Sequence, residues 1–224
     1  LIWLVVAGYV ISAGVAVTLE PLTASTPSPA ALPARRGLVR DPAFLAGLAA
    51  ASLIQSSHAV YYSFSALQWR TEGFDGTAIA ALWGLGVIAE IVLFALQGRL
   101  RPAMTPTVLL TIGGVGGAVR WLAMALAPPA GLLPVLQLLH ALSFGATHLG
   151  MLGFVVTRAA PHQSATAQGY LAIALATTMA GATVLSGLLF AAFGDLAYAA
   201  MALMAAFGAG AGYAAHRMTR HAAA

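Results

Sequence analysis

The sequence predicts an all-α integral membrane protein, and three observations carry that prediction. Of its 224 residues, 60% are hydrophobic and only 7% are charged, whereas roughly a quarter of the residues in a soluble domain are charged. The mean hydropathy is +0.89. The apolar runs have about the 20-residue length of a membrane-crossing helix, and the alternation typical of barrel strands is absent.

Composition also excludes several classes of function. The chain has no cysteine, which excludes disulfides, cysteine-ligated metals and cysteine nucleophiles. Its net charge of +4 does not indicate nucleic-acid binding, because the arginines lie mostly between apolar runs, where they set membrane topology. We find neither an HExxH metal motif nor a nucleophile elbow, so we do not expect an enzyme.

Seven membrane spans are predicted, separated by short polar turns and one longer linker. The linker, residues 20–41, is rich in Pro, Ser, Thr and Ala, which is typical of an irregular segment. The chain begins at Leu1 inside an apolar run, without the basic region of a signal peptide, so we expect an N-terminal truncation. The spans are residues 1–19, 43–66, 77–97, 105–127, 132–156, 165–191 and 196–215.

The arginines predict the orientation of these spans. Arg70 alone falls on one side, and eight arginines fall on the other: Arg35, Arg36, Arg40, Arg99, Arg101, Arg158, Arg217 and Arg220. The arginine-rich side, which includes the linker and the C-terminus, is therefore predicted to be cytoplasmic. Six spans after the linker suggest two inverted three-helix repeats.

Two glycine pairs lie four residues apart within predicted spans. They are Gly113 with Gly117 and Gly208 with Gly212. Such pairs allow two helices to approach closely, although glycine is common in membrane helices in any case.

Two ionisable residues, Glu90 and Arg120, fall within neighbouring apolar spans. A carboxylate in hydrocarbon either takes up a proton or finds a cation. Glu90 lies a few residues on the cytoplasmic side of the membrane centre and Arg120 on the other, about 10 Å apart in depth. The pair is interpreted as a proton-exchanging site, with a static pair that fixes helix register as the alternative.

A polar stripe runs along the fifth span, formed by Gln137, His140, Thr147 and His148 at helical spacing. Histidine exchanges protons near neutral pH. We favour His148, near the membrane centre, over His140 as the proton carrier. The alternative is that one histidine only makes a hydrogen bond between helices.

The second span carries a similar stripe of Gln55, His58, Tyr62 and Ser65, with Tyr61 beside it. Aromatic rings with polar tips suit a small aromatic or sugar-like ligand. For the two tyrosines, an interfacial aromatic belt is the alternative.

Four segments resemble the phenylpropionate-permease-like branch of the major facilitator superfamily: Ser56–Trp69, Ala81–Leu96, Gly117–Trp121 and Leu136–Leu152. That branch is similar to the lactose permease and to nucleoside–proton symporters. The resemblance covers nearly all of the chain from about Pro42 onward.

The resemblance implies the C-terminal six-helix half of a twelve-helix major facilitator fold, plus the preceding helix. Residues 1–19 would be the last helix of a truncated N-terminal domain, and residues 20–41 the central cytoplasmic linker. Residues 42–217 would form the C-terminal domain, followed by a cytoplasmic tail, residues 218–224.

The resemblance also implies proton symport of a small organic solute, such as 3-phenylpropionate or a related aromatic carboxylate, across a bacterial inner membrane. Glu90, Arg120 and His148 match the residues that handle the proton. The expected partners are the solute, protons, the bilayer and the missing N-terminal domain, without a cofactor or metal. The substrate-binding candidates are Gln55, His58, Tyr61, Tyr62, Gln137 and His140.

The sequence departs from the family pattern in two places. The GRLRP turn keeps its arginines but lacks the acidic residue often found there, which puts a gating role of this turn in doubt. Met151 occupies the position where the lactose-permease pattern has a carboxylate. The alternative functions are a sugar or nucleoside symporter, a membrane haem or redox protein, and a structural fragment that does not transport.

Overall fold

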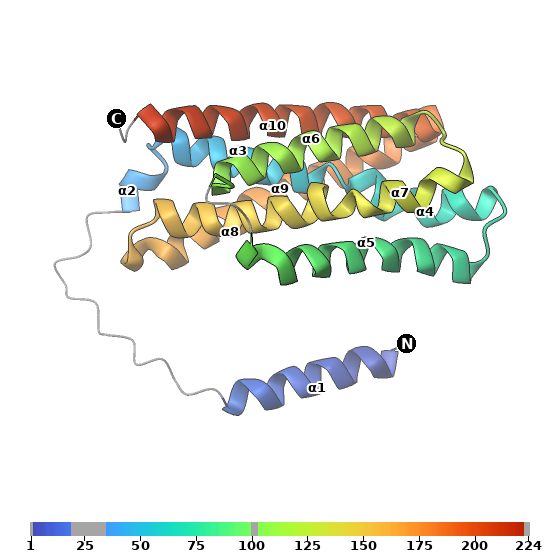
Figure 1. Cartoon of the computed structure of the whole chain (residues 1–224), viewed down its shortest axis with the longest axis horizontal. Helices are drawn as coiled ribbons and strands as arrows, with labels where there is room; N and C mark the ends of the chain where they lie inside the picture. Colours follow the sequence, from blue (N-terminus) through green and yellow to red (C-terminus); the bar gives the residue numbers. More distant parts are fainter. Residues whose placement is uncertain (1, 19–34, 100–102, 222–224) are drawn as a thin grey trace. The chain divides into compact units, whose positions relative to one another are not determined.

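The computed structural model (Figure 1) describes residues 2–18, 35–99 and 103–221, and these residues contain helices and turns but no strand. The chain divides into two compact units, Leu1–Pro33 and Ala34–Ala224. In the first unit, α1 spans Ile2–Thr18, close to the predicted first span. Most of the predicted linker, part of the 99–101 turn and the end of the tail lie outside the described residues.

The second unit is a bundle of helices that run side by side (Figure 1). It starts with the one-turn helix α2 (Arg35–Leu38). The longer elements are α3 (Pro42–Ser56), α4 (Ala59–Thr71), α5 (Gly76–Leu96), α6 (Pro106–Ala125), α7 (Leu133–Leu138), a π-helical turn (Ala141–Ala146), α8 (Thr147–Arg158), α9 (Ser164–Phe193) and α10 (Ala197–His221).

Five stretches of the described residues are long and apolar enough to cross a membrane. The last of them, Ser164–His221, contains both α9 and α10. The chain reverses direction between these two helices (Figure 1). Gly194 stands at this point with a φ of +56°, a left-handed conformation that glycine adopts without a steric penalty. The predicted all-α membrane fold is therefore confirmed.

Polar side chains define where several helices begin. The Asp41 carboxylate accepts a hydrogen bond from the Ala43 amide, with Pro42 at the first helical position of α3. Asp75 caps α5 in the same way through the Ala78 amide. These side chains satisfy amide groups that have no partner inside the helix, so the sequence itself sets these boundaries.

Two predicted spans are interrupted, although we expected each to be one continuous helix. Residues 43–66 were expected to form one helix, but α3 ends at Ser56 and α4 begins at Ala59. There the Ser57 hydroxyl donates to the Ile54 carbonyl at 2.6 Å, and such local bonds compete with regular helix pairing. The span predicted at 132–156 is divided by the π-helical turn Ala141–Ala146. In a π-helical turn the hydrogen bonds skip one residue more than in an α-helix.

The last helix also differs from the prediction. It was expected to end near Ala215, but α10 continues to His221. Arg220 and His221 lie in its last turn, where positive charge interacts favourably with the helix dipole.

Helices α6 and α10 pack closely because small residues line their contact. A Cβ atom added to Gly114 would lie 2.7 Å from the Ala209 backbone nitrogen. One added to Gly212 would lie 3.1 Å from the Thr111 nitrogen, and one at Gly117 would lie 3.3 Å from the Ala205 Cβ. Of the two predicted glycine pairs, Gly117 and Gly212 lie at this contact, whereas Gly113 faces Thr147 and Gly208 faces Ile54.

Replacing Gly114 by alanine should destabilise the bundle by about 1–3 kcal/mol, because the methyl group would overlap the α10 backbone. Gly210 provides a matched control on α10, since a Cβ there meets no atom within 4 Å. Gly210→Ala should therefore not destabilise the protein. Denaturation in detergent would measure both variants, and equal stability of the two would contradict close packing at Gly114.

Two apolar clusters divide the bundle along its length. One includes Trp69, Trp121 and Tyr198, and the other includes Phe44 and Phe154. Buried polar residues lie between the two clusters on two segments of the chain. On α3–α4 this residue is His58, and on α7–α8 the residues are Gln137, His140, Ser143 and Thr147. The candidate site lies in this polar layer.

Candidate functional site

Arg120, on α6, is fully buried and bonds to three side chains of the neighbouring segment. Its Nη2 donates to Gln137 Oε1 at 2.7 Å. Its Nη1 lies 3.0 Å from His140 Nδ1 and 3.3 Å from Ser143 Oγ. A buried guanidinium is stable only with such partners, because an unpaired charge in the bundle would be very costly.

Two aromatic rings also contact this guanidinium. Its Cζ lies 4.6 Å from the centre of the Tyr61 ring and 4.5 Å from that of Trp121, distances that allow cation–π attraction. The Tyr61 hydroxyl donates to Gln137 Oε1 at 2.9 Å. Tyr61 is thus buried against Arg120, as expected for a residue of the bundle interior rather than of an interfacial belt.

His140 lies between Arg120 and Glu90. Because a guanidinium only donates hydrogen bonds, His140 Nδ1 must be the acceptor of the Arg120 bond. A neutral His140 therefore carries its proton on Nε2, which lies 3.6 Å from Glu90 Oε2. Among the described residues, no carboxylate oxygen lies within 4 Å of Arg120. Arg120 and Glu90 are thus not in direct contact, and the imidazole ring of His140 lies between them.

The same reasoning fixes the proton of His58. Its Nδ1 faces the carbonyl oxygens of Ile54 and Gln55 at 3.3 and 3.1 Å. Carbonyls only accept hydrogen bonds, so Nδ1 is the protonated nitrogen. The Ser143 hydroxyl therefore donates to His58 Nε2 across 3.3 Å while it accepts from Arg120.

The π-helical turn and one glycine bring Glu90 to this network. Gly145 belongs to the turn, and a Cβ there would lie 3.0 Å from Leu93 Cδ2 and 3.5 Å from Glu90 Cγ. The side chains of Leu93 and Glu90 thus pack directly over Gly145, on the face where a larger residue would place its side chain.

Two cavities open beside the network. The first, of about 220 Å³, is lined by aromatic residues and reaches both Glu90 and His140. The second, of about 470 Å³, is mostly apolar and reaches Gln55 and His148. Tyr62 and Phe144 line both cavities, so the two adjoin. Cavities with apolar walls and a few polar groups are typical of small-molecule sites.

The predicted site residues divide into those that reach a cavity and those that lie behind it. Arg120, His58 and Gln137 are buried and line neither cavity. The others line at least one of them: Gln55, Tyr61, Tyr62, Glu90, His140 and His148.

The structure assigns different surroundings to the two histidines of the fifth span. His140, and not the favoured His148, joins Glu90 to Arg120. His148 packs against Phe94 and Phe144, with ring centres 5.7 and 6.0 Å apart. A single polar stripe was expected, but the π-helical turn lies between the two histidines and changes the helical register.

Sequence reasoning did not identify three residues of the site. Ser143 links Arg120 to His58, and it stands three residues after His140, a spacing that places it on the same helix face. Trp83 lines the smaller cavity and stacks on Tyr61 at 4.6 Å. Phe144 stacks on His140 at 5.1 Å. Trp83 precedes Glu90 by seven residues, a helical spacing that would have identified it.

The described residues gather no group of three or more His, Asp or Glu side chains that would hold a metal ion. The ring nitrogens of His58 and His140 bond to serine, arginine and backbone groups or face Glu90. The two histidines thus interact with neighbouring groups of the protein.

A bundle of membrane-crossing helices around a buried ionisable network beside a cavity fits a secondary transporter. Residues 3–210 match the family described as MFS_1 like, and the chain therefore belongs to this family of major facilitator transporters. It is a multi-pass membrane protein. Because this family consists of transporters, the prediction that the protein is not an enzyme is confirmed.

Over 158 residues the chain is 34% identical to a protein of Escherichia coli (strain K12) described as a probable 3-phenylpropionic acid transporter. The alignment covers 70% of this chain but only 42% of the relative, so the chain spans less than half of the relative's length. The expected resemblance to the phenylpropionate-permease-like branch is confirmed. No solved structure gives a significant match.

Proposed function

We propose that this chain is the C-terminal half of a proton-coupled symporter for a small organic acid, such as 3-phenylpropionate or a related aromatic carboxylate. The single observation that carries the proposal is the Glu90–His140–Arg120 connection at the wall of an aromatic cavity. The description of the E. coli relative as a probable 3-phenylpropionic acid transporter suggests the substrate class.

The charges of the network explain how a proton and an anion would bind together. With Glu90 ionised and His140 neutral, the site has no net charge, because Arg120 and Glu90 cancel. Protonation of Glu90 leaves the charge of Arg120 uncompensated, and a monovalent anion in the cavity restores neutrality. Two negative charges about 4 Å apart repel by about 4 kcal/mol at an effective dielectric of roughly 20. The anion would therefore bind only after Glu90 has taken up its proton.

Glu90 is the better proton carrier of the two groups that face each other. An imidazolium at His140 would carry a proton on Nδ1, which would point at the Arg120 guanidinium 3.0 Å away. That state places two positive groups in contact and loses a hydrogen bond. Glu90 faces the cavity and can exchange its proton without breaking the Arg120 network.

The aromatic walls suit the remainder of such a substrate. Tyr62, Trp83 and Phe144 line the smaller cavity, and aromatic pairs gain energy beyond the area that they bury. A carboxylate directed at protonated Glu90 would accept its hydrogen bond, with the ring between these side chains. Arg120 would act on the substrate through its charge and through His140.

The proposal includes the domain assignment. Residues 42–217 would form the C-terminal six-helix domain, residues 1–19 the last helix of the preceding domain, and residues 20–41 the linker. Two inverted repeats are supported by the interruption of the first span in each repeat, at Ser57–His58 and at Ala141–Ala146. The arginine-rich side, with the C-terminus, would face the cytoplasm of a bacterial inner membrane.

The test is substrate-induced alkalinisation of the outer medium in de-energised vesicles that carry the full-length protein. We expect 3-phenylpropionate to cause alkalinisation, because each anion would enter with a proton. A proton ionophore should abolish the signal. Alkalinisation by a sugar or nucleoside, but not by 3-phenylpropionate, would keep proton coupling and replace the substrate class. A folded protein that responds to none of these solutes would contradict the proposal.

A further inference from the structure

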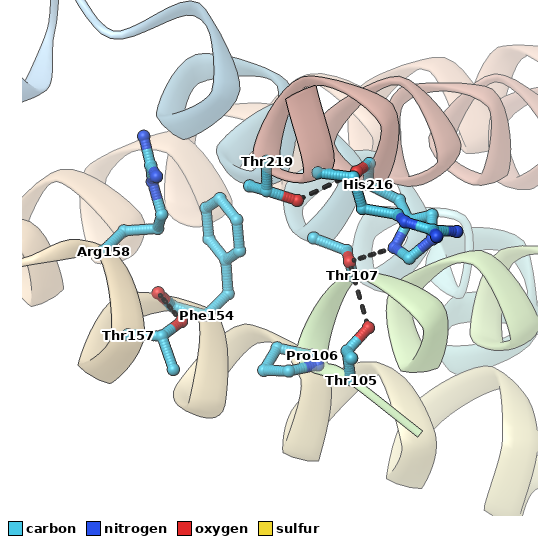
Figure 2. Close-up of a pocket in the computed structure, with 9 residues that line it drawn as sticks. Thr105, Pro106, Thr107, Phe154, Thr157, Arg158, His216 and Thr219 are labelled. Carbon is cyan, nitrogen blue, oxygen red and sulfur yellow. Dashed lines mark hydrogen bonds between the residues drawn. The ribbon is translucent and has the colours of Figure 1, made fainter. Parts of the chain in front are cut away.

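A third cavity lies away from the network described above, where α6 begins and where α8 and α10 end (Figure 2). Its volume is about 330 Å³. Figure 2 shows the Phe154 ring between Arg158 on one side and Thr107 and His216 on the other. The lining residues are Thr105, Pro106, Thr107, Phe154, Thr157, Arg158, His216, Thr219 and Arg220.

The ionisable groups that line this cavity are all basic: Arg158, His216 and Arg220. Arg158 forms an ion pair with Asp41 through its Nη2, but its buried Nε has no hydrogen-bond partner among the described residues. Within the same part of the chain, Arg220 makes no hydrogen bond or ion pair, and no carboxylate oxygen lies within 4 Å of it. The charge of Arg220 at the cavity is therefore uncompensated.

The free donors of the cavity are those of its basic residues. The hydroxyls of Thr157 and Thr219 donate to carbonyls of their own helices. His216 Nδ1 is bonded to Thr107 Oγ1 at 3.0 Å. Arg220 and the remaining N–H groups of Arg158 can thus serve a ligand that accepts hydrogen bonds.

We propose that this cavity binds a phosphate-type oxyanion. Guanidinium groups form strong, charge-assisted hydrogen bonds to phosphate oxygens, and these bonds are often bidentate. The group can come from two sources, the headgroup of an anionic phospholipid or a free phosphate in the aqueous phase. Basic pockets between membrane helices on the cytoplasmic side bind lipid headgroups. The apolar surfaces of Pro106 and Phe154 would suit the glycerol and acyl part of a lipid.

The experiment measures the thermal stability of the full-length protein, because a ligand that binds the folded state raises the Tm. One arm adds inorganic phosphate, with sodium chloride at equal ionic strength as the reference. The other arm compares mixed detergent micelles that contain phosphatidylcholine with mixed micelles that also contain phosphatidylglycerol. A rise in Tm with phosphate assigns a free anion, and a rise only with phosphatidylglycerol assigns a lipid headgroup.

Two variants test whether the ligand occupies this cavity. Arg220→Gln removes a lining charge and should weaken binding about tenfold. Arg217→Gln is the matched control: it removes the same charge three residues earlier on α10, where Arg217 bonds to Tyr213 outside the cavity. It should leave the affinity nearly unchanged.

Three results would overturn the proposal. The first is a Tm that neither phosphate nor phosphatidylglycerol raises above its reference. The second is an Arg220→Gln variant that keeps the wild-type affinity. The third is an equal loss in both variants, which would indicate general surface charge rather than a site. The experiment does not depend on transport, so it can fail or succeed independently of the proposed symport.

Discussion

Replacing Glu90 by glutamine should abolish proton-driven accumulation of substrate while exchange of substrate across the membrane continues. Glutamine has nearly the shape of the protonated acid, so the cavity would stay in its anion-accepting state. It cannot release a proton, so the coupling to the proton gradient is lost. Accumulation and counterflow in vesicles with the full-length protein would measure the two processes separately.

Glu72→Gln is the matched control for this experiment. Glu72 follows α4 at the end of the bundle and accepts a hydrogen bond from Gln68 at 3.1 Å. Its loss removes one carboxylate without affecting the network, so accumulation should remain. If Glu90→Gln still accumulates substrate against a gradient, Glu90 does not carry the coupled proton.

The second large effect is expected for Arg120→Ala, which should destabilise the protein by about 3 kcal/mol or more. Arg120 makes three hydrogen bonds to neighbouring segments and contacts two aromatic rings. Hydrogen bonds between membrane helices contribute about 0.6 kcal/mol each on average, and a cation–π contact about 1 kcal/mol. Denaturation in mixed micelles would measure the loss.

Arg217→Ala serves as the control, because Arg217 is exposed and bonds only to Tyr213 in the described chain. It should change stability by less than about 0.5 kcal/mol. The double variant Arg120→Ala with Glu90→Gln separates two explanations. Since Arg120 and Glu90 are not in direct contact, the second change should recover little stability. Recovery of most of it would indicate that the two opposite charges, rather than the hydrogen bonds, stabilise the bundle.

Hydropathy predicted the apolar helices of the bundle but not the interruptions within two of them. Glu90 and Arg120 stood out because charged side chains are rare in apolar spans. They were interpreted as a pair, but in the structure the His140 ring lies between them. The sequence identified His140 as polar and buried but not as the connecting group.

The remaining part of the site depends on local backbone geometry that a regular helical pattern does not contain. The π-helical turn Ala141–Ala146 changes which residues share a face, so His140 and His148 receive different partners. Gly145 lies directly under the side chains of Leu93 and Glu90, a contact that the residue type alone does not reveal. Phe144 and Trp83 resemble ordinary apolar residues of a membrane span, and only their position at a cavity distinguishes them.

The close packing of α6 against α10 has a consequence for movement during transport. The two backbones meet where Gly114 faces Ala209 and where Gly212 faces Thr111, so neither helix can slide or rotate without a collision. Interrupted helices have no such restriction, because a broken hydrogen-bond ladder bends at low energetic cost. Bending within this bundle would then occur at the joints at Ser57–His58 and Ala141–Ala146. Both joints adjoin the Arg120 network, so a change in protonation would act directly on the parts that can bend.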